Sequence, residues 1–215
     1  MYRTISGNIF IKILITVVIS ILLSSCAQDN VKQTESSHRQ NQSQAAAKKP
    51  TKLTRAEREH YRKGITALYK NDFAAAQRIF SEFIRNKPEL AGPYTNLALL
   101  HFKKNELDKA FKFVNQALER NPRQSQAYNL RAQIYVSRGK IHKAKDDYLK
   151  AVQLKPDYSN AQYNLALLYD IYLQEIELAI KHYEIYMSLL KKPDEKTLEW
   201  INHLKGTLKD ASANS

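Results

Sequence analysis

From residue 57 onward the chain repeats itself every 34 residues, and this period limits the folds that it can adopt. Proline recurs at this interval, at Pro88, Pro122 and Pro156. Alanine recurs in the same way at Ala76, Ala110 and Ala144, and small residues do so at Gly64, Ala98, Ala132 and Ala166. A fixed period of this length indicates stacked supersecondary units, each of which buries its apolar face only against its neighbours.

Each period predicts a pair of helices. A polar turn such as Asn71-Asp72 or Asn105-Glu106 separates two apolar segments, and small residues let the two helices approach closely. Proline ends the second helix because it lacks the amide that would continue the hydrogen-bond ladder. The expected pairs are 56–69 with 73–86, 91–103 with 107–120, 125–138 with 141–154, and 159–171 with 175–190.

These residues resemble the tetratricopeptide repeat. The resemblance implies an all-α, right-handed solenoid of four helical hairpins that acts as a protein-binding module, with repeats at 57–90, 91–124, 125–158 and 159–193. At the fourth position, where the family has an aromatic residue, the chain has His60, Tyr94, Tyr128 and Gln162. Tyr163 is expected to stand in for Gln162.

The fourth repeat departs from the period. Ala179 follows Ala144 by 35 residues, and Pro193 follows Pro156 by 37. The extra residue is expected in a turn at 172–174, followed by a longer second helix. Beyond Pro193, residues 194–209 predict a capping helix, which solenoids need for solubility. Its apolar face is expected to comprise Leu198, Trp200, Ile201, Leu204 and Leu208.

The N-terminal segment has the pattern of a targeting signal. Residues 1–25 contain two early cations, an apolar run at 13–23 and small residues before Cys26, which is the pattern of a secretory signal peptide. A membrane-spanning helix needs about 20 apolar residues, and Lys12 interrupts the run, so cleavage is favoured over spanning. Cys26 is the one cysteine of the sequence and can form no intramolecular disulfide.

Residues 23–26 resemble the bacterial lipobox. The resemblance implies that Cys26 is acylated after cleavage and that the protein is a membrane-anchored lipoprotein. Ala27, by analogy with Gram-negative lipoproteins, implies the periplasmic face of the outer membrane. Residues 26–55 lack apolar periodicity and are expected to form a disordered tether. An ordinary signal peptide that happens to end in cysteine is the alternative.

Neither the net charge nor the histidines indicate a nucleic-acid-binding, catalytic or metal site. The net charge of +13 falls to +11 without residues 1–25, and it suggests surface steering rather than a specific nucleic-acid partner. The six histidines lie far apart in sequence, and no phosphate loop or nucleophile motif is present. Asp146 and Asp147 diverge on a helix and are expected to be solvated. The sequence therefore predicts no enzyme, no metal and no cofactor.

Binding is predicted on the first helices, which the resemblance places along a concave groove. The expected groove residues are Tyr61, Ile65, Asn96, Leu99, Asn129, Gln133, Tyr163, Asn164 and Leu167. Asn96 and Asn164 could hold a peptide backbone because an amide both donates and accepts hydrogen bonds, although asparagine is also common there for structural reasons. Tyr61, Gln126 and Leu130 stand where repeats that clamp a carboxylate carry cations.

The resulting hypothesis is a non-catalytic adaptor or assembly scaffold that binds another envelope protein. Its alternatives are a pilotin-like assembly factor of type IV pili and a regulator that recruits a cell-wall hydrolase. The sequence does not identify the partner, and the oligomeric state stays open.

Overall fold

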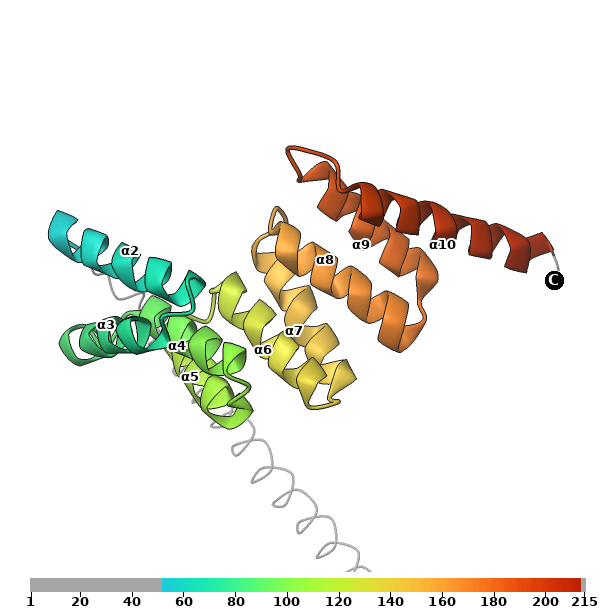
Figure 1. Cartoon of the computed structure of the whole chain (residues 1–215). Helices are drawn as coiled ribbons and strands as arrows, with labels where there is room; N and C mark the ends of the chain where they lie inside the picture. The colour runs from blue at the N-terminus through green and yellow to red at the C-terminus, as the bar shows by residue number, and fades with distance from the viewer. Residues whose placement is uncertain (1–51, 214–215) are drawn as a thin grey trace, which may run out of the picture. The chain divides into compact units, whose positions relative to one another are not determined.

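The computed structural model describes residues 52–213, and the described chain is entirely helical (Figure 1). Four hairpins follow one another, and a further helix ends the described chain. The first helices are α2 (Arg55–Tyr69), α4 (Ala91–Lys103), α6 (Ser125–Ser137) and α8 (Ser159–Leu167). The second helices are α3 (Phe73–Asn86), α5 (Leu107–Arg120), α7 (Ile141–Leu154) and α9 (Ile176–Ser188), and the final helix is α10 (Glu195–Ala213). Each helix packs on the next along the chain, which confirms the predicted all-α solenoid.

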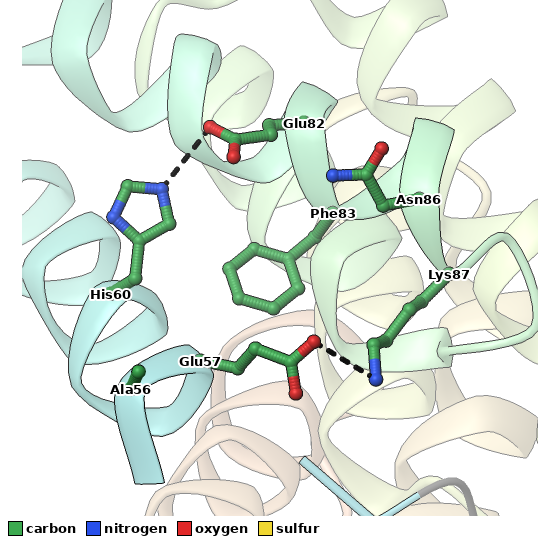
Figure 2. A pocket seen from close by; sticks show the side chains of 7 residues that line it. All are labelled: Ala56, Glu57, His60, Glu82, Phe83, Asn86 and Lys87. Carbon is green, nitrogen blue, oxygen red and sulfur yellow. Dashed lines mark hydrogen bonds and ion pairs between the residues drawn. The ribbon is translucent and has the colours of Figure 1, made fainter. Parts of the chain in front are cut away.

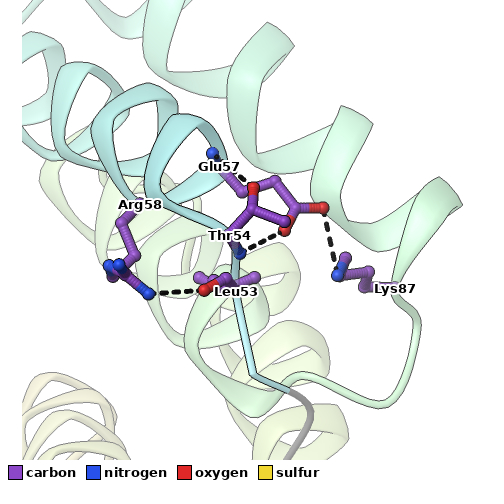
Figure 3. Close-up of polar contacts among 5 residues, drawn as sticks. All are labelled: Leu53, Thr54, Glu57, Arg58 and Lys87. Atoms are coloured by element: carbon purple, nitrogen blue, oxygen red, sulfur yellow. Dashed lines mark hydrogen bonds and ion pairs between the residues drawn. The ribbon is translucent and has the colours of Figure 1, made fainter.

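A capping box starts the first helix (Figure 3). The Thr54 hydroxyl accepts a hydrogen bond from the Glu57 amide at 3.2 Å, and the Thr54 amide donates to Glu57 Oε2 at 2.7 Å. These two bonds satisfy amides that have no partner inside the helix. The other carboxylate oxygen of Glu57 forms an ion pair with Lys87 Nζ at 3.0 Å, and Lys87 directly follows α3. The cap therefore also fixes the end of α3 beside the start of α2.

A residue with positive φ ends the first helix of every repeat, at Asn71, Asn105, Gly139 and Gln174. Asparagine and glycine tolerate this left-handed conformation better than other residues. In the first three repeats the amide after this residue donates to the carbonyl five residues back, as Asp72 does to Ala67 at 2.9 Å. The polar turns predicted from the sequence owe their residue types to this geometry.

The small residues of the repeat lie at the contact between the two helices of each pair. Ala98, Ala132 and Ala166 have no exposed surface, and a Cβ added to Gly64 would lie 2.8 Å from Ile79 Cγ2. Buried Phe80 packs against Gly64, at the position that the repeat pattern assigns to a bulky residue. Interiors packed this closely leave no room for larger side chains at these positions.

The fourth repeat absorbs its extra residue inside the helix rather than in the turn, so the predicted turn at 172–174 is wrong. Helix α8 continues as a π-helix, η1 (Leu168–Leu173), before Gln174 adopts φ 56°. The Glu175 amide accordingly donates to the Tyr169 carbonyl six residues back, at 2.9 Å. A π-helical turn accommodates one more residue than an α-helical turn. The expected longer second helix is also wrong, since α9 ends at Ser188.

Helix α10 packs on α9, but only part of its predicted apolar face is buried. Ile201 and Leu204 are buried together with Thr197, and Leu208 is half-buried. Leu198 and Trp200 are exposed at 41% and 43%, so the predicted buried face is wrong at these two positions, although Trp200 still contacts the fourth hairpin through Asp170. The buried residues recur at intervals of three or four along one side of the helix, and Leu198 and Trp200 lie at the two edges of that side.

The predicted signal peptide, the predicted lipidation of Cys26 and the predicted tether up to residue 51 lie outside the described residues, and Arg55, which the sequence assigns to the tether, begins α2. Among the helices that the structure describes, none has the length and apolar content to span a bilayer.

Candidate protein-binding face

The candidate binding surface is built on the first helices of the four repeats. We name it the first-helix face and define it by the nine predicted residues Tyr61, Ile65, Asn96, Leu99, Asn129, Gln133, Tyr163, Asn164 and Leu167. Eight of them are half-buried, so each both packs against the core and keeps part of its surface open to a partner. Asn129 is the exception, with 5% of its surface exposed.

Two hydrogen bonds join neighbouring first helices across this face. Asn96 on α4 donates its amide to the Tyr61 hydroxyl on α2 at 2.8 Å. Asn164 on α8 donates to Asn129 Oδ1 on α6 at 3.0 Å. Both bonds span 35 residues, so the same contact recurs in two of the three repeat junctions. The two asparagines expected to hold a partner's backbone thus already connect adjacent repeats, and their carbonyl oxygens make no hydrogen bond to the described residues.

Tyr61 illustrates how a core residue can also serve this face. Its ring packs edge-on against Phe80 and Phe83, at centroid distances of 5.5 and 5.1 Å. Burial raises the pKa of the Tyr61 phenol, so its hydroxyl keeps its proton at neutral pH. That hydroxyl accepts the Asn96 amide and donates to no acceptor in the described chain. The hydroxyl is therefore free to donate a hydrogen bond to a partner's carbonyl oxygen.

The apolar members of the face are held by the core beneath them. Ile65 and Leu99 pack together against the core of the first two repeats, and Leu167 packs against that of the last two. Tyr163 contacts Tyr183 and Tyr186 at centroid distances of 5.7 and 4.9 Å. These contacts restrict the rotamers of the four side chains, so little entropy remains to be lost on binding.

Gln162 itself makes the contact that belongs to the fourth position of the repeat. The expectation that Tyr163 stands in for it is therefore wrong. In the second repeat, the Tyr94 hydroxyl donates to the Pro88 carbonyl at 3.2 Å. In the fourth, Gln162 donates to the equivalent Pro156 carbonyl at 2.9 Å. Its amide oxygen accepts from His182 Nδ1 at 2.8 Å, and the residue is buried at 4% exposure. An amide therefore makes the hydrogen bond that a tyrosine hydroxyl makes two repeats earlier, which leaves Tyr163 free to join the face.

The expectation that Asp147 is solvated is wrong. This residue is 6% exposed and receives two hydrogen bonds from Arg131, at 2.7 and 2.8 Å, whereas Asp146 is exposed. Arg131 also donates to Asn115 Oδ1 at 2.9 Å, so one guanidinium connects α5, α6 and α7. Its pairing with Asp147 raises the pKa of Arg131 above the usual value. A fork of donors facing a carboxylate gives this pair its fixed geometry.

Two features of the described chain were not predicted from the sequence. Trp200 donates its indole N–H to Asp170 at 2.6 Å, so α10 is tied to η1 as well as to α9. A pocket opens between α2 and α3 beside His60, which the sequence treated only as a repeat residue (Figure 2). In the part of the chain from residue 52 to 213, no three histidine, cysteine, aspartate or glutamate side chains gather to hold a metal ion.

Two family models match the chain. One, described as tetratricopeptide repeat, covers residues 67–134, and a second, described as TPR repeat, covers 132–170. Residues 67–170 are therefore similar to tetratricopeptide repeats. The human protein O-mannosyl-transferase TMTC3 is 35% identical over 98 residues, which are 45% of this chain and 11% of that protein. The chain thus spans about a tenth of the length of the curated relatives that it matches first.

Solved structures with the same repeats show the fold. The pilF protein of Pseudomonas aeruginosa is 18% identical with a TM-score of 0.64, over 72% of this chain and 70% of that one. The first tetratricopeptide domain of Spaghetti (RPAP3), bound to the HSP90 peptide SRMEEVD, is 23% identical with a TM-score of 0.51, over 55% of this chain and 93% of that one. These similarities show the fold, a helical solenoid of the tetratricopeptide type.

Proposed function

We propose that this protein is a membrane-anchored lipoprotein whose first-helix face binds another envelope protein as an adaptor or assembly scaffold, without catalysis. One observation carries the binding part of the proposal. Apolar and amide side chains share the first helices, and the core holds the apolar ones while leaving them partly open. Rigid aromatic and aliphatic side chains beside hydrogen-bonding groups are what protein interfaces use.

The known complex of a similar repeat domain supports a peptide as the class of ligand, because the Spaghetti domain holds an HSP90 peptide. This chain should bind a different kind of peptide. At the three positions where carboxylate-clamping repeats carry cations it has Tyr61, Gln126 and Leu130, and Leu130 is buried at 4% exposure. A mixed apolar and amide surface favours an extended segment or an amphipathic helix over a free carboxylate.

Anchoring and binding are tested separately. For anchoring, cells are labelled with a fatty acid, and Cys26→Ser is expected to abolish the label and to release the protein from the membrane. Fractionation of the wild-type protein with the outer membrane would support the proposed location at its periplasmic face. A label that persists in Cys26→Ser would refute the lipid anchor and leave the binding proposal untouched.

For binding, a photo-crosslinking amino acid replaces Gln133 on the first-helix face, and Lys143 on the exposed side of α7 serves as the control position. The captured partner, once identified, is titrated against the double variant Leu99→Ala/Tyr163→Ala. We expect its affinity to fall at least about thirtyfold, because the loss of even one large interface anchor costs about 2 kcal/mol or more. Equal capture from both positions would contradict the proposal. The partner's identity would also decide between pilus assembly and recruitment of a cell-wall hydrolase.

A further inference from the structure

The pocket beside His60 lies at the first repeat, apart from the first-helix face. It has a volume of about 230 Å³, and none of the nine face residues lines it. The lining residues come from α2 and α3 and from the residue after α3: Ala56, Glu57, His60, Glu82, Phe83, Asn86 and Lys87. Figure 2 shows Phe83 between two polar pairs, with His60 and Glu82 on one side and Glu57 and Lys87 on the other.

The equivalent place in the second repeat is occupied by the chain itself. Thirty-four residues after Asn86 stands Arg120, whose guanidinium lies 3.7 Å from the centroid of the Tyr94 ring. Arg120 also donates to the Pro88 carbonyl at 2.5 Å and to the Gln116 carbonyl at 2.7 Å. Tyr94 and Gln116 are the counterparts of His60 and Glu82. The second repeat therefore binds a guanidinium between an aromatic ring and backbone carbonyls.

The first repeat keeps the aromatic wall but lacks the arginine. Asn86 is too short to reach the position that Arg120 occupies one repeat later. His60 supplies a ring in place of Tyr94 and stacks near Phe83 at a centroid distance of 5.9 Å. Glu82 replaces the neutral Gln116 by a carboxylate. The substitutions open the position and add a negative charge beside it.

We propose that this pocket binds the guanidinium group of an arginine side chain from a protein partner. A guanidinium matches the site because it stacks on aromatic rings and presents a planar fork of donors to a carboxylate. Glu82 has one oxygen near His60 Nε2 at 3.2 Å, and its second oxygen accepts no hydrogen bond from the described residues. That second oxygen and the Asn86 side-chain carbonyl are the acceptors offered to the arginine.

The charges around the pocket favour a cation over an anion. Two glutamates and one lysine line it, and the lysine is already paired, since Lys87 Nζ lies 3.0 Å from Glu57 Oε1. Glu82 lies on the other side of Phe83 from this pair (Figure 2). An incoming carboxylate would face the Glu82 carboxylate, whose partner here is the His60 ring, whereas an arginine would form an ion pair with its second oxygen. The walls of Ala56 and Phe83 would bury the aliphatic stem, as long cationic side chains prefer.

The experiment uses the full chain carrying Cys26→Ser, which leaves the described residues unchanged. N-acetyl-arginine amide is titrated into the protein, and the His60 ring resonances are followed by NMR. N-acetyl-citrulline amide is the neutral comparison, since it has nearly the same shape without the charge. Three variants are compared: Glu82→Gln removes the carboxylate, Asn86→Arg fills the pocket from within, and Glu59→Gln makes the same charge change on α2 outside the pocket.

The arginine probe is expected to shift the His60 resonances in a saturable manner, and citrulline to bind about tenfold more weakly, as loss of a charge-assisted hydrogen bond predicts. Glu82→Gln should weaken arginine binding to the same degree, Asn86→Arg should abolish it, and Glu59→Gln should leave it unchanged. If Asn86→Arg does not fold, as judged by circular dichroism, Glu82→Gln decides the question. Equal affinity for citrulline, or full binding to Glu82→Gln, would overturn the proposal while leaving the first-helix face in place.

Discussion

Removing the charge of Asp147 tests whether the Arg131 network holds the middle of the solenoid together. Asp147→Asn preserves the shape of the side chain but presents an amide group to the guanidinium donors that now contact two carboxylate oxygens. Breaking a buried ion pair costs about 3–5 kcal/mol, because the remaining charge is left without a partner. Here the Arg131 side chain is 22% exposed and keeps its bond to Asn115. Solvent and Asn115 thus offset part of the cost, and we expect a loss of about 2–3 kcal/mol.

The assay is urea unfolding of the full chain carrying Cys26→Ser, followed by far-ultraviolet circular dichroism. Asp146→Asn is the matched control, because it makes the same change one residue earlier on an exposed side chain. It should alter the free energy of unfolding by less than about 0.5 kcal/mol. The double variant Arg131→Met/Asp147→Leu should be more stable than Asp147→Asn, since it removes both charges together. Equal effects of Asp146→Asn and Asp147→Asn would refute the reasoning.

Three further outcomes follow from single residues. Gly139→Ala should lower the free energy of unfolding by about 1 kcal/mol because φ is 68° there, whereas Gly139→Asn should be nearly neutral in the same urea titration. Burial, and to a lesser degree Lys181, lowers the pKa of His182 in the folded state. Stability should therefore fall as the pH drops from about 6.5, the unfolded pKa, toward the lower folded pKa. Unfolding measured at several pH values should lose this dependence in His182→Gln but keep it in His203→Gln. The pKa of Glu106 is lowered to about 2 by hydrogen bonds from Lys104, Lys109 and His101. The contribution of Glu106 to stability should therefore be lost as the pH falls from 4.5 toward that value. In Glu106→Gln, the thermal unfolding temperature should change less with pH across this range.

The hairpins could be predicted because the repeat determines both the buried positions and the turns. Small residues such as Ala98 and Ala132 recur where two helix backbones approach, and prolines recur where second helices end. A period shared by four segments averages out local irregularities, so the helix boundaries of the first three repeats follow from the sequence alone. The nine residues of the first-helix face came from the resemblance to the tetratricopeptide repeat, and their role in binding stays a prediction.

Contacts between different helices could not be predicted from the period. Asp147 looks solvated in sequence because nothing marks Arg131, 16 residues earlier, as its partner. Trp200 looks like a core residue because it is large and apolar, but the helix directs it toward Asp170 instead. The pocket beside Phe83 had one available signal. An alignment of the repeats with one another places Asn86 opposite Arg120, and this loss of a long cationic side chain is visible in the amino-acid sequence itself.

The π-helical turn of the fourth repeat shows how this architecture tolerates insertions. One added residue would rotate every later side chain by about 100° around an α-helix, and would turn the buried positions toward solvent. Here Leu168–Leu173 takes up the rotation within a single turn. Ala179 and Tyr183 therefore remain buried in α9, as their counterparts are in the earlier repeats. An insertion at this place changes the local surface, where Ile171 and Tyr172 are exposed, and leaves the packing of the repeat intact. The end of a first helix is thus a place where such a solenoid can vary its surface during evolution without losing its core.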